Sequence, residues 1–203
     1  MFIAIDAVLD GPTAGVLHDA AAGLVFADGA ATAGRLARAV KSNDQAVTSD
    51  KLDAILVQVT NALSANPVFA SAARPRAMTQ LILSRYREGQ TYGMHVDDAL
   101  MGGLRTDLSF TLFLGDPATY DGGALVIADT AEERAVKLPA GSLVLYPATT
   151  LHRVEPVTRG TRLCVVGWVQ SWVRAAERRE ILFDLDRAVA TIHDRDGKTD
   201  LLD

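Results

Sequence analysis

Residues 85–97 read RYREGQTYGMHVD, and together with LHRVEPVTRGTR at residues 151–162 this stretch decides the fold of the chain. His95 and Asp97 are two residues apart, so on an extended segment both side chains project from the same face. The second segment supplies His152. Two histidines and one carboxylate on one side of an ion suit Fe(II) and leave the other coordination positions open. The pattern therefore predicts one metal ion held by His95, Asp97 and His152.

A candidate anion-binding residue follows in the second segment. Arg162 lies ten residues past His152, about one strand and turn onward, and its planar guanidinium can hold a carboxylate in two hydrogen bonds. Arg159 is the competing residue, but Arg159-Gly160 reads as a turn whereas Arg162 begins a strand-like run. A metal ion beside an anchored diacid suggests 2-oxoglutarate.

Other interpretations of the predicted metal site stay open. The same three side chains could form a polar cluster satisfied by hydrogen bonds, and Zn could take the place of iron because its affinity for such ligands is higher. Asp98 is the neighbouring carboxylate, but strand alternation points it away from His95, which favours Asp97. Open positions for a keto acid and O2 favour iron.

The string Tyr86-x2-Gly89-Gln90-x-Tyr92-x2-His95-x-Asp97, together with RTDLSFTLFL, YDGGALVI, LPAGSLVLYP and LHRVEPVTRGTR, resembles the PKHD-type hydroxylases, bacterial relatives of the prolyl and lysyl hydroxylases. The resemblance also takes in AVKSNDQ and ILFDLD, and so nearly the whole chain. It implies an Fe(II)- and 2-oxoglutarate-dependent dioxygenase that uses O2, hydroxylates its substrate, releases succinate and CO2, and takes L-ascorbate as a reductant. It further implies another helix after residues 201–203, where the sequence stops. Spacing alone supports only a metal site with an anion clamp.

The resemblance also assigns cosubstrate-binding roles. Arg162 matches the arginine that pairs with the distal carboxylate of 2-oxoglutarate, and Tyr86 matches a tyrosine that hydrogen-bonds the cosubstrate. Alternation along LSFTLFL makes Thr111 an inward hydroxyl, on the same face as Phe113, where close animal relatives often carry tyrosine. Trp168 shares a strand face with Arg162, so it either walls the site or packs in the core.

Two functions of other classes would use the same residues. A non-catalytic jelly-roll sensor would bind iron or 2-oxoglutarate without releasing CO2, because a fold and a site can outlive an activity. A Zn-dependent hydrolase would work without O2. Turnover and metal content separate these alternatives from a dioxygenase.

The composition indicates one compact domain. With 203 residues, of which 49% are hydrophobic, the chain can bury a continuous core. A net charge of -5 and a pI near 5.3 give no basic field for nucleic acid, so the expected partner is a small-molecule or peptide substrate. The single cysteine, Cys164, reads as a buried strand residue and suits a reducing cytoplasm. No apolar run approaches the roughly 20 residues of a membrane span, and Asp6 and Asp10 interrupt any signal peptide. The oligomeric state is not indicated.

The predicted fold class is α+β, with a double-stranded β-helix (jelly roll) core at residues 78–171. Its expected strands are separated by glycine, proline and aspartate turns and read LILSRY, LSFTLFL, GALVIAD, AVKLP, SLVLYP, RVEPVT and TRLCVVGWVQ. Residues 1–77 are expected to form an N-terminal helical support, and residues 172–203 a C-terminal helix with a polar tail, packed on the roll.

Periodicity places the individual helices. We expect a short strand at residues 2–5, a helix capped by Asp10, a loop at residues 27–33, and an amphipathic helix from Ser49-Asp50 to Asn66-Pro67. The buried stripe of the last helix is predicted to be Leu52, Ile55, Leu56, Val59 and Leu63. The C-terminal helix is expected at residues 172–192, with an apolar stripe of Ile181, Leu182, Leu185 and Val189. Its charged residues are expected to form a solvated face: Glu177, Arg178, Arg179 and Glu180.

A few polar residues outside these motifs have two interpretations. Lys41 and Asn43, in AVKSNDQ, either reach the substrate mouth or belong to a polar loop. Arg105 either lines the mouth or lies on the surface. Lone histidines on helices or in polar tails are usually not ligands, so His18 and His193 are not predicted to bind metal.

Overall fold

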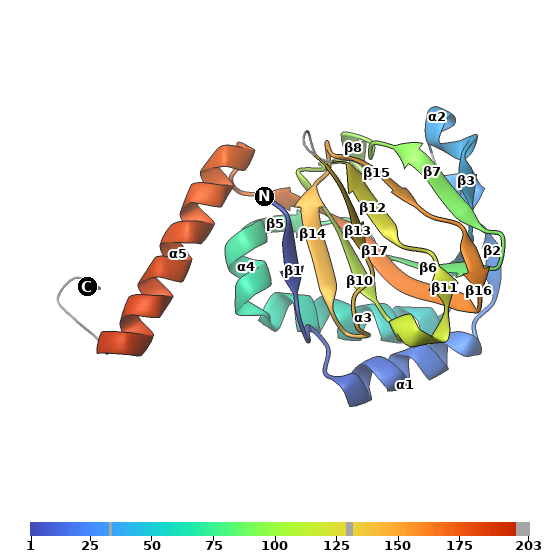
Figure 1. Ribbon diagram of the computed structural model, residues 1–203, viewed down its shortest axis with the longest axis horizontal. Helices are drawn as coiled ribbons and strands as arrows, with labels where there is room; N and C mark the ends of the chain where they lie inside the picture. The colour runs from blue at the N-terminus through green and yellow to red at the C-terminus, as the bar shows by residue number, and fades with distance from the viewer. Residues whose placement is uncertain (33, 129–131, 198–203) are drawn as a thin grey trace.

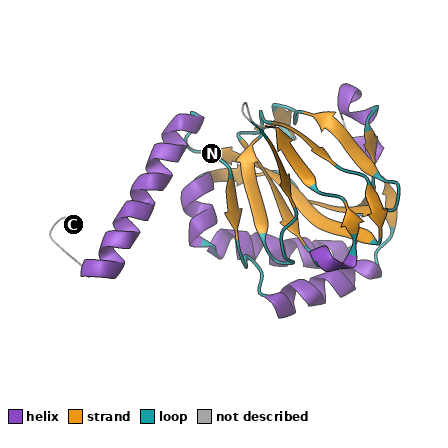
Figure 2. Cartoon of the chain, in the orientation of Figure 1, coloured by secondary structure: helices purple, strands orange, loops and turns teal. Residues whose placement is uncertain are grey.

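The computed structural model describes residues 1–32, 34–128 and 132–197, and it consists of two antiparallel β-sheets that face each other, with helices covering the outer face of the larger one (Figure 1, Figure 2). The larger sheet has the strand order β1-β14-β10-β17-β6-β4-β2, with β5 also paired to β17, and the smaller has the order β13-β12-β15-β7-β3. This is the predicted jelly roll.

The strands have the following bounds. In the larger sheet they are β1 (Ile3–Ile5), β2 (Phe26–Asp28), β4 (Asp44–Ala46), β5 (Pro75–Met78), β6 (Ile82–Arg87), β10 (Leu108–Phe113), β14 (Leu143–Pro147) and β17 (Thr161–Ser171). In the smaller sheet they are β3 (Lys41–Ser42), β7 (Thr91–His95), β12 (Leu125–Ala128), β13 (Glu133–Val136) and β15 (Leu151–Val154). Two short pairs join β8 (Leu100–Met101) to β9 (Leu104–Arg105) and β11 (Asp121–Gly122) to β16 (Val157–Arg159).

The helices are α1 (Gly11–Ala22), α2 (Arg35–Arg38), α3 (Asp50–Ala65), α4 (Pro67–Ala73) and α5 (Ala176–Asp196), with 3-10 turns η1 (Gly29–Thr32) and η2 (Pro117–Thr119). The caps of α1 and α3 are those expected: Asp10 accepts a hydrogen bond from the Thr13 amide at 2.7 Å, and Ser49 accepts one from Leu52. The predicted stripe of α3 is buried throughout.

A second helix begins where the sequence suggested only an end. Asn66 terminates α3 and also caps α4, since its Oδ1 accepts a hydrogen bond from the Phe69 amide at 2.9 Å. Pro67 occupies the first helical position, where its missing N–H costs nothing. The Asn66-Pro67 pair therefore ends α3 and begins α4.

The larger sheet is buried on both faces, which explains why LSFTLFL is apolar nearly throughout. Leu108, Phe110 and Leu112 of β10 pack in the cluster that includes α1, α3 and α4. The alternating residues point into the roll, where Phe113 packs with Tyr86, Leu125, Tyr146 and Cys164, among others. The predicted alternation of β10 thus separates a structural core from the interior that holds the site.

The N-terminal region does more than support the roll. Strands β1, β2 and β4 extend the larger sheet and β3 extends the smaller one, so residues 1–77 belong to both sheets as well as to the helical layer. The predicted strand RVEPVT is divided: β15 ends at Val154 and β16 begins at Val157, because Pro156 has no amide hydrogen to continue the ladder.

The C-terminal helix differs from its prediction. It begins at Ala176 rather than 172 and ends at Asp196, so His193 lies within the helix. In Figure 1, α5 projects away from the roll and touches it near α4. The side it buries holds Arg179 and Phe183, while Ile181, Leu185 and Val189 of the predicted stripe are exposed.

Glu177, Arg178 and Glu180 of the predicted solvated face are exposed. The prediction is wrong for Arg179, which is buried and whose guanidinium donates to two backbone carbonyls, Val173 O and Arg174 O, at 2.8 Å each. A pattern that counts Arg as polar cannot foresee this burial. The end of the predicted tail, residues 198–203, lies outside the described residues. None of the described helices is both long and apolar enough to span a membrane.

Candidate metal and anion site

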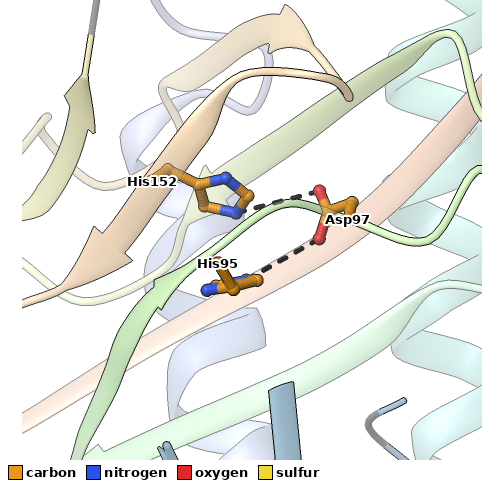
Figure 3. A group of neighbouring side chains, drawn as sticks. All are labelled: His95, Asp97 and His152. Carbon is orange, nitrogen blue, oxygen red and sulfur yellow. Dashed lines mark ion pairs between the residues drawn. The ribbon is translucent and has the colours of Figure 1, made fainter. Parts of the chain in front are cut away.

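Three potential metal ligands meet inside the roll (Figure 3). His95 is the last residue of β7, Asp97 follows two residues later, and His152 lies on β15 directly opposite His95 in the pairing of the two strands. The Nε2 atoms of His95 and His152 are each 3.8 Å from an oxygen of Asp97, and one ligand atom from each residue lies within 4.8 Å of the others. Both histidines are buried, at 8% and 4% exposure.

Backbone carbonyls orient both imidazole rings. His95 Nδ1 lies 2.8 Å from the carbonyl oxygen of Gly93, and His152 Nδ1 lies 2.9 Å from that of Thr150. With Nδ1–H donating to a carbonyl, the lone pair is on Nε2, the atom that faces Asp97. Burial, with a further contribution from His152, lowers the pKa of His95 to about 4, so that ring is neutral near pH 7, as a metal ligand must be.

The carboxylate is oriented as well. Ser109, on β10, donates its hydroxyl to Asp97 Oδ2 at 2.6 Å. Asp98, the neighbouring carboxylate, is exposed and lies against Gly34 instead of the histidines. The structure therefore brings Asp97, and not Asp98, to His95 and His152.

This donor set fits Fe(II). Metal–ligand bonds of about 2.0–2.2 Å place adjacent ligand atoms about 3 Å apart, so contacts of 3.8 Å need only a small inward shift around an ion. Two imidazoles and one carboxylate on one side of the ion leave its remaining positions facing the pocket.

Arg162 lies at the floor of the same pocket. It is 1% exposed, pairs in register with Tyr86 across β17 and β6, and lies over the rings of Tyr86 and Phe113 at 5.1 and 5.3 Å. Its Nη1 donates to Cys164 Sγ at 2.9 Å, and within the described part of the chain its Nε has no partner and no carboxylate pairs with it. Gly123, with φ of +64°, makes room for the side chain, since a Cβ there would lie 3.2 Å from Arg162 Cδ. A buried cation without an anion is costly, so the surroundings of Arg162 fit an anionic ligand.

The other residues predicted to bind the cosubstrate line this pocket too: Tyr86, Thr111 and Trp168. Burial raises the pKa of Tyr86, which keeps its phenol protonated and able to donate a hydrogen bond. The indole Nε1 of Trp168 is buried and without a partner among the described residues. Each of these side chains can therefore offer a hydrogen-bond donor.

Other candidates lie elsewhere. Arg159 is exposed and pairs with Asp121 at 2.6 Å, and Arg105 pairs with Asp107 through two hydrogen bonds, outside the residues that line the pocket. Of the two remaining histidines, His18 on α1 is partly exposed and His193 on α5 is exposed. Of the two arginines considered for the anion clamp, only Arg162 reaches the pocket.

Sequence analysis assigned no role to two aromatic residues beside the histidines. The Tyr92 ring stacks on His95 with 3.6 Å between centroids, and the Tyr146 ring meets His152 edge-on at 5.1 Å. Tyr146 could have been found from alternation along SLVLYP, because it pairs with Ser109. Tyr92 belongs to the motif string, but alternation does not predict its contact with His95, since a bulge between β7 and β15 breaks the two-residue period.

Comparisons with known proteins agree with this geometry. Residues 81–170 match the family model of the 2OG-Fe(II) oxygenase superfamily. A PKHD-type hydroxylase from Maricaulis maris is 53% identical over 178 residues, which are 88% of this chain and 81% of that protein.

Two solved structures share the fold. A prolyl-4-hydroxylase from Pseudomonas putida has a TM-score of 0.57 and 20% identity, over 85% of this chain and 93% of that one. A prolyl hydroxylase from Trichoplax adhaerens, in complex with a hypoxia inducible factor peptide fragment, has a TM-score of 0.57 and 16% identity, over 89% and 86%. At these identities the likeness extends to the fold alone.

Proposed function

The chain belongs to the PKHD-type hydroxylases, within the 2OG-Fe(II) oxygenase superfamily, and we propose that it hydroxylates a C–H bond of a peptide or small-molecule substrate while 2-oxoglutarate becomes succinate and CO2. It is an Fe(II)/2-oxoglutarate-dependent dioxygenase. The observation that carries the finer proposal is Arg162, a buried guanidinium without an anion, in one pocket with three converging metal donors.

His95, Asp97 and His152 are the Fe(II) ligands in this proposal. Their orientation is held by groups that do not touch the ion: the carbonyls of Gly93 and Thr150. Such outer partners fix ring tautomers and ligand directions before the ion arrives. The three ligands thus retain the ion while leaving its open side toward the pocket.

Arg162 binds the distal carboxylate of 2-oxoglutarate, and Tyr86 donates its phenolic hydrogen to the same end of the molecule. Thr111 and Trp168 line the space between this end and the metal, where a hydroxyl and an indole N–H can orient the cosubstrate. With iron bound, the reaction places one atom of O2 in the product hydroxyl and the other in the new carboxylate of succinate. The apolar interior of the roll excludes water from this chemistry.

Two further features belong to the proposal. L-ascorbate would return iron to the Fe(II) state after turnovers in which no substrate is hydroxylated. A cytoplasmic location is supported by the single, buried thiol of Cys164, which suits a reducing compartment.

The test begins without O2. Adding Fe(II) and 2-oxoglutarate to the purified protein under anaerobic conditions should produce a weak visible charge-transfer band, and admitting O2 should yield succinate. The His152→Ala variant, which lacks one ligand, should give neither signal. Iron-loaded protein that shows no band and forms no succinate would refute the proposal. A band without succinate, even with candidate substrates present, would indicate a sensor, and activity with Zn in the absence of O2 would indicate a hydrolase.

A further inference from the structure

The segment Lys41–Asn43 forms one wall of the pocket. Lys41 lies on β3 in the smaller sheet, and after Asn43 the chain enters β4 in the larger sheet, so this segment crosses from one sheet to the other. Both side chains line the pocket that holds the metal donors. Asn43 is 2% exposed, and its side chain interacts with the phenol of Tyr86, another lining residue. The wall therefore presents polar side chains to the pocket.

Lys41 is positioned beside one of the metal ligands. It pairs with Tyr92 across β3 and β7, and its Nζ lies 5.1 Å from the centroid of the Tyr92 ring, which in turn stacks on His95. The Nζ donates to Thr32 Oγ1 at 3.3 Å, and no described carboxylate forms an ion pair with it. The Tyr92 ring and the Thr32 hydroxyl thus hold the ammonium one ring away from His95, and the ammonium has further donors available.

The exposed fractions of Arg162 and Lys41 show how deep each side chain lies in the pocket. Arg162 is fully buried at the floor, whereas Lys41 is half-buried and bonded to Thr32, an exposed residue of the rim. The two cations of the pocket therefore lie at different depths, Arg162 in the interior and Lys41 nearer the surface. A molecule that entered the pocket from solvent would meet Lys41 first.

We infer that Lys41 binds a carboxylate of the substrate to be hydroxylated, so that this enzyme takes acidic substrates. The inference rests on the proposed function, because it requires that Arg162 holds 2-oxoglutarate. Lys41 and Arg162 are the only lysine and arginine among the described residues that line the pocket, which assigns one cation to each anionic ligand.

The electrostatics of Lys41 agree with this role. Burial lowers its pKa to about 8, and the charges of Asp97 and Asp28 oppose that shift. The ammonium form is therefore less strongly favoured near pH 7 than in a free lysine. A substrate carboxylate would stabilise the charged form through a charge-assisted hydrogen bond.

The test uses two matched probes, cyclohexanecarboxylate and its neutral carboxamide, on protein loaded with Mn(II) and saturated with 2-oxoglutarate. Mn(II) accelerates the relaxation of nearby probe protons in NMR, so the measurement reports binding close to the metal. Wild-type protein should relax the carboxylate and not the amide. Lys41→Met should weaken carboxylate binding by about 10- to 100-fold, Lys41→Arg should retain most of it, and Lys51→Met, at an exposed lysine of α3, should change nothing.

The remaining outcomes overturn the inference. They are equal relaxation of both probes, no relaxation of either by the wild type, or unchanged carboxylate binding in Lys41→Met. The anaerobic charge-transfer band of Fe(II) and 2-oxoglutarate shows whether the proposed function fails or only the role of Lys41. If wild-type protein lacks the band, the proposed function fails. If Lys41→Met loses a band that the wild type and Lys41→Arg show, Lys41 serves the cosubstrate and the inference fails alone.

Discussion

Replacing Arg162 with Met should separate cosubstrate binding from metal binding. The guanidinium is 1% exposed, and its described partners are the thiol of Cys164 and the hydroxyl of Tyr120 rather than a carboxylate, so its main electrostatic partner is expected to be the ligand. A charge-assisted pair contributes about 1.5–3 kcal/mol, and leaving a buried carboxylate unpaired adds to the loss. The affinity for 2-oxoglutarate should therefore fall on the order of 10- to 1000-fold. Iron content should stay unchanged, because all three metal ligands remain.

Thermal unfolding measures two quantities in one assay: the stabilisation by 2-oxoglutarate and the stability of the ligand-free variant. At a 2-oxoglutarate concentration of about 100 times its Kd, with Mn(II) present, the ligand should add about 2.7 kcal/mol to the free energy of unfolding of the wild type. For a chain of this size that raises Tm by about 5 to 11 °C. Arg162→Met should lose between about half of this increase, for a 10-fold loss of affinity, and nearly all of it, for a 100-fold loss or more, at the same concentration. Without ligand it should melt no lower than the wild type, because Met removes a buried, unpaired charge.

Arg162→Lys should recover part of the affinity, since it keeps the charge but not the two-pronged geometry. Arg159→Ala should behave like the wild type, because Arg159 pairs with Asp121 on the surface. If Arg159→Ala abolishes 2-oxoglutarate binding and Arg162→Met leaves it intact, the assignment of the clamp is wrong. A large drop in the Tm of ligand-free Arg162→Met would show that contacts within the protein already satisfy the guanidinium.

Three other substitutions probe the support of the site. Ser109→Ala removes the 2.6 Å hydrogen bond to Asp97 and should lower Mn(II) affinity about 10- to 100-fold in a titration, with the fold retained by circular dichroism. Gly123→Ala forces a side chain into a backbone with φ of +64° and should cost about 1–3 kcal/mol in urea unfolding. Asp44→Asn tests pH dependence: burial alone would raise the pKa of Asp44, but hydrogen bonds from Gln90 and Arg85, among others, lower it overall. Because the folded-state pKa is depressed, the stability that the Asp44 carboxylate contributes is fully present above the unfolded-state pKa near 4 and is lost as the pH falls through the folded-state pKa. The free energies of unfolding of the wild type and Asp44→Asn should therefore differ at pH 7 and converge in acid.

Each of these three predictions has a result that would contradict it. Unchanged metal affinity in Ser109→Ala would mean that Asp97 needs no orientation by its neighbour. An undiminished free energy of unfolding in Gly123→Ala would show that the turn can relax. A stability difference for Asp44→Asn that persists below the folded-state pKa would point to shape rather than charge as its cause.

The sequence predicted elements that local periodicity determines. The apolar stripe of α3 and the inward alternation of β10 depend on spacing within one segment, and the structure has both. The strand carrying Arg162 followed from the same kind of signal. His152 needed the motif as well, because its approach to His95 depends on pairing between two strands distant in sequence.

What the sequence did not predict depends on contacts between segments. Tyr92 reaches His95 because of a bulge, which no single strand reveals. Lys41 and Asn43 enter the pocket because their segment crosses between sheets, and a polar loop would have had the same composition. Arg179 is buried because two backbone carbonyls accept its hydrogen bonds, so its exposure was wrongly predicted while its charged neighbours are exposed as expected.

The way α5 is attached divides the helix into two parts with different dynamics. Its first half is tied down by the buried Phe183 and by Asp186, which pairs with Arg74 at 2.7 Å, whereas the residues from Arg187 to Asp196 are almost all exposed and, among described residues, form no ion pair with the roll. Short helical segments without packing are marginally stable in water. Amide hydrogens in the last turns should therefore exchange with solvent through local fraying, while those of β10 and β17 exchange only through global unfolding. The distal helix can open and close many times without disturbing the residues that face the metal.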